Sequence, residues 1–424
     1  MKYWKKLSAK EINYRIGEAL NGTINFEEFT CLGIPASRLD EQLFPSTLPY
    51  QQQAPLLQVY MQNPNHIGCH TLGDSELFFS GTQNLEKELI ELIAVDLLKA
   101  GEHSCDGYVA AGGTEANLQA VWVYRNYFIQ HHGARHEEIA IVCTSDTHYS
   151  IAKAANLLHL ECLKIPVDHY TRRLSSTLLN EQIGVAMQSG KKYFIAIANM
   201  GTTMFGSVDD PDDYAHAFQN AGAPFFIHVD GAFGGFIYPM LGDTEPCTFA
   251  NPNVSSITLD AHKMLQAPYG TGLFIIRKGF MPYVVTKEAA YVNGYDLTVS
   301  GSRSGANAVA VWLLLHSYGP FGWLEKINKL LYRTQWLCEE LSRLEVRFFN
   351  ERNMNIITIE GEFVSAELAL KYGLVPDQHQ GRTRWYKIVI MDHVDLDLLN
   401  AFLTDLKESL HQKECTRSGE LTLA

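Results

Sequence analysis

Apolar β-branched runs alternate with amphipathic stretches from about residue 85 to residue 280. This alternation is typical of β-α units built around a mostly parallel sheet. The runs predict strands at 107–110, 139–143, 161–165, 193–198, 225–229, 255–259 and 271–276. Apolar residues at helical spacing predict helices between them, at 115–130, 150–158, 176–189 and 209–221. The pattern therefore predicts a large α/β domain.

The last third of the chain has a different pattern. Residues 301–344 are expected to be mostly helical, with a break at Gly319-Pro320. Two β-branched runs, at 355–359 and 386–391, flank a helical segment, and an amphipathic helix is expected at 395–412. These elements predict a small C-terminal α+β domain.

The first 80 residues are rich in Pro, Gln and Asn and show only modest periodicity. We interpret them as an arm that packs against a partner subunit. The predicted division is therefore an arm at 1–80, a large α/β domain at 81–300, connecting helices at 301–344, a small domain at 345–412 and a frayed tail at 413–424.

The composition narrows the possible classes of protein. A chain of 424 residues with 46% hydrophobic residues can bury a large core. The formal charge of −13 argues against nucleic acid or an anionic membrane as a partner, because both require clustered Lys and Arg. The eight cysteines show no Cys-x-x-Cys spacing, and the histidines no metal-site spacing. With no secretory signal or membrane span apparent, we expect a cytoplasmic protein with reduced thiols.

Lys263 and Asp230 lie at the ends of two expected strands. Lys263 follows the run Ser256–Asp260, and Asp230 ends the apolar run that begins at Phe225. A buried carboxylate can keep the ring nitrogen of pyridoxal phosphate protonated, and a lysine can bind the aldehyde of that cofactor as a Schiff base. On its own, an aspartate such as Asp230 is more often a turn residue at a strand end, and a lysine such as Lys263 is more often a solvated surface residue. The two together suggest pyridoxal phosphate.

A glycine-rich turn provides a candidate phosphate site. Gly112-Gly113-Thr114 follows the strand expected at 107–110 and precedes a helix. Glycines allow close approach of the backbone, and a helix N-terminus offers free N–H groups to an anion. Many such turns only cap a helix and bind nothing. A phosphate site is favoured here because the turn lies in the same α/β domain as Lys263 and Asp230.

Two further strand ends carry candidate ligands. His148 follows the strand expected at 139–143, in a position where an imidazole could stack on a flat ring, and its alternative role is packing near a helix cap. Thr202 and Thr203 follow the strand at 193–198, and either could contact the cofactor ring or the substrate. The alternative is an ordinary strand-to-loop turn.

Taken as a set, these segments resemble the group II pyridoxal-phosphate-dependent amino acid decarboxylases over roughly residues 60–400. The chain is most similar to the archaeal tyrosine/aspartate decarboxylases, with segments that also resemble histidine and serine decarboxylases. The resemblance implies the fold type I (aspartate aminotransferase) architecture. The motifs that carry it are Gly112-Gly113-Thr114-Glu115-Ala116-Asn117, Asp146-Thr147-His148-Tyr149-Ser150, His228-Val229-Asp230-Gly231-Ala232-Phe233-Gly234-Gly235, Asp260-Ala261-His262-Lys263-Met264 and Ser300-Gly301-Ser302-Arg303-Ser304-Gly305.

The resemblance also implies roles for individual residues. Lys263 would be joined to the cofactor, Asp230 would pair with the pyridine nitrogen and His148 would stack on the ring. The remaining cofactor contacts would come from Gly113, Thr114 and His262 at the phosphate, Ala232 at the other ring face, and Thr202.

Proton donation and substrate binding are implied at other positions. Tyr291 matches the loop tyrosine that is thought to protonate the substrate carbon after loss of carbon dioxide, and Tyr295 is its neighbouring alternative. Where the glutamate-decarboxylating relatives place an arginine for the substrate carboxylate, this chain has Lys387, which lacks the planar fork of arginine. Arg384 and Arg303 are the other candidates, and Arg303 could equally make a structural contact.

The expected activity is α-decarboxylation of an acidic or aromatic L-amino acid by a carboxy-lyase. A homodimer with active sites between its subunits is also implied. One alternative is another carbon–carbon lyase on the same scaffold, such as a sphingosine-phosphate lyase, although the chain lacks the usual hydrophobic anchor. The other is a catalytically silent homodimer that binds pyridoxal phosphate.

Overall fold

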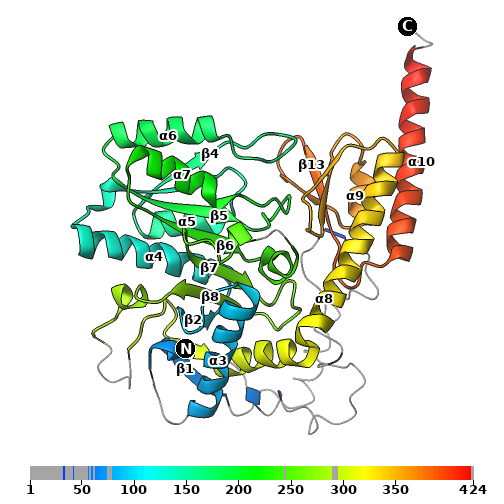
Figure 1. The fold of residues 1–424 in the computed structure, drawn as a ribbon. Coiled ribbons are helices and arrows are strands. Elements are labelled where there is room, and N and C mark those ends of the chain that lie inside the picture. The colour runs from blue at the N-terminus through cyan, green and yellow to red at the C-terminus, as the bar shows by residue number, and fades with distance from the viewer. Residues whose placement is uncertain are drawn as a thin grey trace, which may run out of the picture.

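The structure is a computed structural model that describes residues 32–33, 42, 56, 59–60, 63–73, 79–242, 245–288 and 295–421. At 80, 245 and 413–421 the description covers the backbone alone. A large α/β body lies beside a small body near the C-terminus, and α8 runs from one to the other (Figure 1). This confirms the predicted fold class.

The large body is organised around a seven-stranded sheet with the order β2-β8-β7-β6-β5-β3-β4. β8 is antiparallel to both of its neighbours, and the other pairs are parallel. All seven strands were predicted to within a few residues. Their bounds are β2 Cys105–Ala110, β3 Ile139–Thr144, β4 Glu161–Ile165, β5 Tyr193–Asn199, β6 Phe225–Gly231, β7 Val254–Asp260 and β8 Gly272–Arg277.

Alternation along the central strands divides the core into two layers. In β3, Ala140 and Val142 pack into the layer that includes α6 and α7, whereas Ile141 packs on the opposite side against α4 and α5. Side chains in a strand point alternately to its two faces, so a doubly covered sheet needs apolar residues at every position. The helices of this body are α3 Ser80–Leu92, α4 Gly113–His132, α5 Tyr149–Leu157, α6 Ser176–Gln188 and α7 Pro211–Ala221.

The small body contains a four-stranded antiparallel sheet with the order β10-β11-β13-β12. Its elements are β10 Phe348–Asn350, β11 Ile356–Glu360, α9 Ala366–Lys371, β12 Val375–Pro376, β13 Trp385–Val389 and α10 Leu396–Leu421. The short strands β10 and β12 were not predicted. The backbone of α10 is helical through Leu421, where the sequence predicted a frayed tail from residue 413.

The connecting helix α8 spans Gly305–Arg343 and is kinked. At Gly319, φ is 62° and ψ is 175°, and Pro320 follows, which confirms the predicted break. The described helices include none that is both long and apolar enough to cross a membrane.

One described part of the predicted N-terminal arm packs on its own chain. β1 (Asn65–Ile67) pairs antiparallel with β9 (Ser302–Ser304), so that His66 lies opposite Arg303. The two strands tie the segment that enters α3 to the segment that enters α8. The remaining short helical turns are η2 His70–Leu72, η4 Ile93–Leu97, η5 His136–Glu138, η6 Gly234–Phe236, η7 Tyr238–Met240, η8 Glu245–Cys247 and η9 Met281–Val284.

Candidate active site

A cavity of about 690 Å³ opens where α4 begins, beside the carboxyl end of β7. Its volume is within the range of small-molecule sites. Residues from six separate segments line it: Ala111, Gly112, Gly113, Thr114, Glu115, Asn117, Leu118, His148, Tyr149, Ala232, Asp260, His262, Lys263, Tyr269, Gly270, Val299 and Ser300. The structure thus brings together Gly113, Thr114, His148, Ala232, His262 and Lys263 of the predicted site.

Lys263 lies in the turn that follows β7. Its Nζ is 3.0 Å from Oδ2 of Asp260, and the same oxygen is 3.6 Å from Nε2 of His262. Asp260 is 3% exposed, and its Oδ1 has no hydrogen-bond partner among the described residues, nor has Nδ1 of His262. Burial lowers the pKa of His262, so this imidazole is neutral at neutral pH. Buried polar atoms without partners are uncommon, and here they face a cavity.

The glycine turn is shaped by close packing. A Cβ atom at Gly113 would lie 2.9 Å from Oδ2 of Asp260 and 3.0 Å from Cβ of Ala232. The position therefore requires glycine, and the N-terminus of α4 is held against the lysine turn. Glu115 stabilises the loop from the other side, because its Oε2 accepts hydrogen bonds from the Ala111 N–H (3.0 Å) and the Ser300 hydroxyl (2.7 Å).

Asp230 ends β6 and is 6% exposed. Its Oδ2 accepts a hydrogen bond from Nδ2 of Asn117 at 2.8 Å, and its Oδ1 accepts one from the N–H of Ala232 at 3.1 Å. His148 caps α5 through Nδ1, which accepts from the N–H of Ser150. Burial lowers the pKa of His148 and favours its neutral form.

Lys387 reaches the large body from β13. It is 3% exposed, and its Nζ donates a hydrogen bond to the carbonyl oxygen of Thr203 at 3.0 Å. Burial, together with the charge of Lys263, lowers its pKa to about 8. The neighbouring Thr202 is also buried, and its Oγ1 lies 2.7 Å from Oγ of Ser207, so its hydroxyl is engaged within its own turn.

Of the predicted residues, Asp230, Thr202 and Lys387 do not themselves line this cavity. The four that remain lie elsewhere. Arg303 is buried, and it pairs with Glu86 at 2.5 Å and donates to the carbonyl oxygens of Gly68 and Val109, which favours its structural role. Arg384 is exposed and does not line the cavity. Tyr291 lies outside the described residues, and Tyr295 is 69% exposed.

The cavity residues that were not assigned a role from the sequence include Asn117, Tyr149, Asp260 and Tyr269. The first three lie within the motifs quoted above, so their place in the sequence beside assigned residues could have indicated that they belong to the site. Tyr269 follows the lysine turn by six residues, and its ring lies 5.0 Å from that of His262. Its contact depends on the path of the loop, which the sequence does not show.

The site has the groups that pyridoxal phosphate needs. The glycine turn and the first N–H groups of α4 suit a phosphate, the partnerless Nδ1 of His262 offers a further contact, and Lys263 is available for covalent attachment. Asp230 is a buried carboxylate suited to a protonated ring nitrogen, and His148 and Ala232 line the cavity. When bound, the cofactor accepts the electrons of the bond that breaks at the substrate Cα.

Comparison with known proteins agrees with this geometry. The family described as "Pyridoxal-dependent decarboxylase conserved domain" matches residues 82–359. Tryptophan decarboxylase of Clostridium sporogenes is 52% identical over 96% of this chain and 98% of its own length. The L-aspartate/L-glutamate decarboxylase of Pyrococcus horikoshii is 31% identical over 80% of this chain and 85% of its own.

A solved structure shows the same architecture. Sphingosine-1-phosphate lyase of Burkholderia pseudomallei aligns with a TM-score of 0.78, covers 100% of this chain and 96% of its own, and is 17% identical. At that identity the likeness concerns the fold alone.

Proposed function

The chain belongs to the pyridoxal-dependent decarboxylase family and is a pyridoxal-phosphate-dependent amino acid decarboxylase, and from that premise we propose that its substrate is an aromatic L-amino acid, tryptophan foremost. The observation that carries this proposal is the 52% identity with the tryptophan decarboxylase over nearly the full length of both chains. The products would be the corresponding aromatic amine and carbon dioxide.

The cavity lining supports an aromatic over an acidic substrate. Among the described lining residues, Lys263 is the one lysine or arginine, and it is accompanied by the carboxylates of Asp260 and Glu115. A substrate with a second carboxylate would need a further cation to compensate for its desolvation. The rings of Tyr149 and Tyr269 line the same cavity and are 65% and 72% exposed, so both can pack against a flat apolar side chain.

Lys387 is the proposed partner of the substrate α-carboxylate. Its ammonium has three donors, and the described residues supply one acceptor, the Thr203 carbonyl oxygen. Burial and, second to it, the positive charge of Lys263 lower the pKa of Lys387. Arg303, which is occupied by Glu86, and the exposed Arg384 have weaker claims to this role.

The chain's own residues would then divide the work. Lys263 holds the cofactor, and Asp230 keeps a proton on its ring nitrogen. His148, Ala232 and Thr202 position the ring, while Gly113, Thr114 and His262 hold the phosphate. Tyr291 stays the proposed proton donor to Cα, with Tyr295 as its alternative.

Two further features belong to the proposal. We expect a homodimer, because the exposed rings of Tyr149 and Tyr269 at the cavity would be shielded from water by a second subunit. Light scattering after size-exclusion chromatography measures this directly. We also place the protein in the cytoplasm, a location compatible with the free thiols of the six described cysteines Cys69, Cys105, Cys143, Cys162, Cys247 and Cys338.

The deciding experiment incubates cofactor-loaded protein with each of the twenty common L-amino acids and identifies amines by mass spectrometry. Tryptamine as the main product supports the proposal, whereas release of amine from aspartate or glutamate alone overturns the substrate assignment. Lys263→Ala is expected to abolish turnover and the borohydride-trapped cofactor adduct. Lys371→Ala, on an exposed helix of the small body, is the matched control and should retain both.

A further inference from the structure

We propose that Asn117 is a positioning residue that orients both Asp230 and His148, with His228 as its buried support. This inference rests on the proposed function, because Asp230 and His148 matter through the cofactor. Asn117 lies on α4 and is 1% exposed. Its Nδ2 donates to Oδ2 of Asp230 at 2.8 Å and to Oγ of Ser150 at 3.0 Å.

The orientation of the Asn117 amide is dictated by its neighbours. An ionised carboxylate only accepts hydrogen bonds, so the amide nitrogen must face Asp230 and the amide oxygen must face away. That oxygen lies 2.9 Å from Nε2 of His228, which must therefore carry a hydrogen. Burial lowers the pKa of His228 to about 4, so the ring is neutral and its Nδ1 is an acceptor.

The chain of hydrogen bonds continues behind His228. Its Nδ1 lies 2.7 Å from Oγ of Ser256, and the Tyr124 hydroxyl donates to the same Oγ at 2.5 Å. The Ser256 hydrogen is therefore directed to His228. From Tyr124 onward each donor in this chain points toward Asp230, so the side chain that would face a protonated ring nitrogen receives its hydrogen bond from an oriented donor.

A second branch leads from Asn117 to His148. Oγ of Ser150 accepts from Asn117, so its own hydrogen is available to Nδ1 of His148 at 2.9 Å. The Ser150 N–H approaches the same Nδ1 at 3.3 Å. Both contacts make Nδ1 an acceptor, so the proton of His148 resides on Nε2. The amide of Asn117 thus orients the Asp230 carboxylate and, through Ser150, sets the tautomer of His148.

Asn117→Asp tests this inference with little change in shape. A carboxylate at position 117 would lie against Asp230, so one of the two acids would have to hold a proton. Asn126→Asp is the matched control: Asn126 lies on the same helix, but its Nδ2 donates to the carbonyl oxygen of Tyr283. Ser150→Ala cuts the His148 branch alone and serves if the Asn117→Asp variant fails to fold.

Two readouts do not depend on turnover. Affinity for pyridoxal phosphate is measured by equilibrium dialysis, and histidine tautomers are measured by 15N NMR of cofactor-free protein, with His148→Gln and His228→Gln assigning the signals. We expect Asn117→Asp to weaken cofactor binding by about tenfold to hundredfold, as for loss of a hydrogen bond to a buried charge. The Nε2–H tautomer signals of His148 and His228 should also become mixed. Ser150→Ala should alter the His148 signal alone, and Asn126→Asp should match the wild type in both measurements.

The outcomes separate this inference from the proposed function. Unchanged histidine signals and cofactor affinity in Asn117→Asp, or an unchanged His148 signal in a folded Ser150→Ala protein, would overturn the role of Asn117. If the signals change as expected but the wild type releases no amine from any aromatic amino acid, the positioning network stands and the proposed substrate fails.

Discussion

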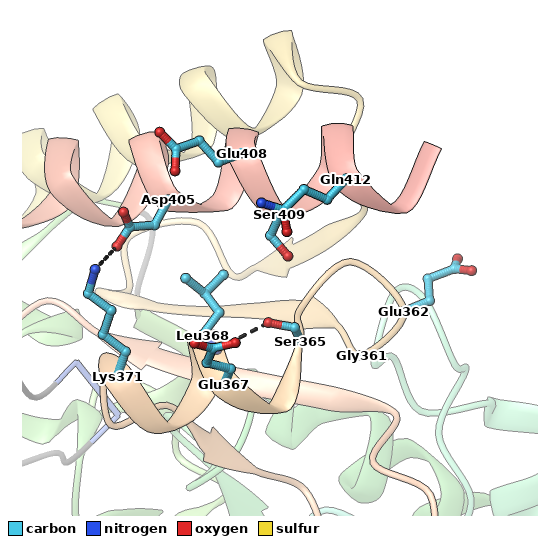
Figure 2. Close-up of a pocket in the computed structure, with 10 residues that line it drawn as sticks. All are labelled: Gly361, Glu362, Ser365, Glu367, Leu368, Lys371, Asp405, Glu408, Ser409 and Gln412. Atoms are coloured by element: carbon cyan, nitrogen blue, oxygen red, sulfur yellow. Dashed lines mark hydrogen bonds and ion pairs between the residues drawn. The ribbon is translucent and has the colours of Figure 1, made fainter. Parts of the chain in front are cut away.

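Two hollows in this molecule differ in chemistry more than in size. The cavity beside Lys263 has a volume of about 690 Å³, and the groove between α9 and α10 has one of about 850 Å³. Figure 2 shows the groove, where Lys371 and Asp405 reach toward each other and are joined at 2.5 Å. The other acidic residues around it are Glu362, Glu367 and Glu408.

The two hollows satisfy their polar groups in different ways. Among the described residues, buried polar atoms without partners occur in the lysine cavity, at Asp260 and His262, and in none of the groove residues. Asp405 receives hydrogen bonds from Lys371 and from the hydroxyl of Tyr372, which lower its pKa. Buried polar atoms without a partner, rather than volume, therefore distinguish the lysine cavity from the groove.

The strongest way to test this comparison is the same substitution at each hollow: in Asp405, which lines the groove, and in Asp230, which accepts hydrogen bonds from the lysine-cavity residues Asn117 and Ala232. Asp230→Asn removes the charge that would face the ring nitrogen, and loss of one partner of a buried ion pair costs about 3–5 kcal/mol. We expect kcat/KM to fall by roughly 10² to 10³-fold or more. The measurement is the rate of amine release from cofactor-loaded protein.

Asp405→Asn is the counterpart in the groove, where the carboxylate pairs with Lys371. It should leave kcat/KM unchanged. An equal loss of activity from both variants would contradict the distinction between the two hollows, because neither loss could then be assigned to the cofactor.

The second prediction concerns the buried network behind the cavity. The pKa of His228 is about 4 in the folded protein and about 6.5 in an unfolded chain. Between these values the unfolded chain binds a proton that the folded protein does not, so the stabilisation is complete above pH 6.5 and is lost as the pH falls toward 4. The shift corresponds to roughly 3 kcal/mol.

The measurement is the free energy of unfolding from pH 7.5 to 4.5 for the wild type and His228→Gln. Burial raises the pKa of Asp209 to about 7, so this residue makes the folded protein more stable as the pH falls, opposite to the effect of His228. Asp209 is present in both proteins, so the contribution of His228 is the difference between their two curves of unfolding free energy against pH. A difference that does not change with pH would contradict a neutral, buried His228.

Much of this architecture was accessible from hydrophobic pattern alone. The seven strands of the large sheet are buried on both faces and appear as continuous apolar runs, as in β3 with Ile139–Thr144. β10 and β12 were missed because they are only three and two residues long and half-buried, so they carry no period. The antiparallel direction of β8 also lay beyond the pattern, because burial alone does not encode strand direction.

Residues of the candidate site could be predicted from the sequence only where they lie at or just after the end of a strand. Lys263, Asp230 and His148 come directly after strands or at their ends, so the topology places them at one edge of the sheet. The proposed role of Asn117 depends on its hydrogen bonds to Asp230 and His228, which are 113 and 111 residues away in the sequence. Contacts over such separations cannot be predicted from residue spacing. For Arg303 both a substrate contact and a structural contact were open from the sequence, and its ion pair with the buried Glu86 favours the structural one.

The third prediction tests the proposed cation at the substrate carboxylate. Since the pKa of Lys387 is about 8, its ammonium is lost as the pH rises through that value, and kcat/KM should decline there. Lys387→Arg keeps its charge at these pH values, so the decline should move to higher pH. Lys387→Met should lower kcat/KM by about tenfold to hundredfold at pH 7, the cost of one charged hydrogen bond. Titration of the substrate amine affects all three proteins alike, so a profile shared by the wild type and Lys387→Arg would contradict the role of Lys387.

The smallest effect is expected in the groove. Lys371 pairs with Asp405, but its side chain is 60% exposed, and exposed ion pairs contribute about 0–1 kcal/mol because water screens the charges. Lys371→Met should therefore lower the free energy of unfolding by at most about 1 kcal/mol and leave cofactor affinity and kcat/KM unchanged. Chemical denaturation in low and high salt measures the first quantity, and added salt should reduce the difference between variant and wild type. A loss of cofactor affinity in this variant would show that the groove communicates with the lysine cavity through α10 or β13, and the two hollows could then no longer be treated as independent.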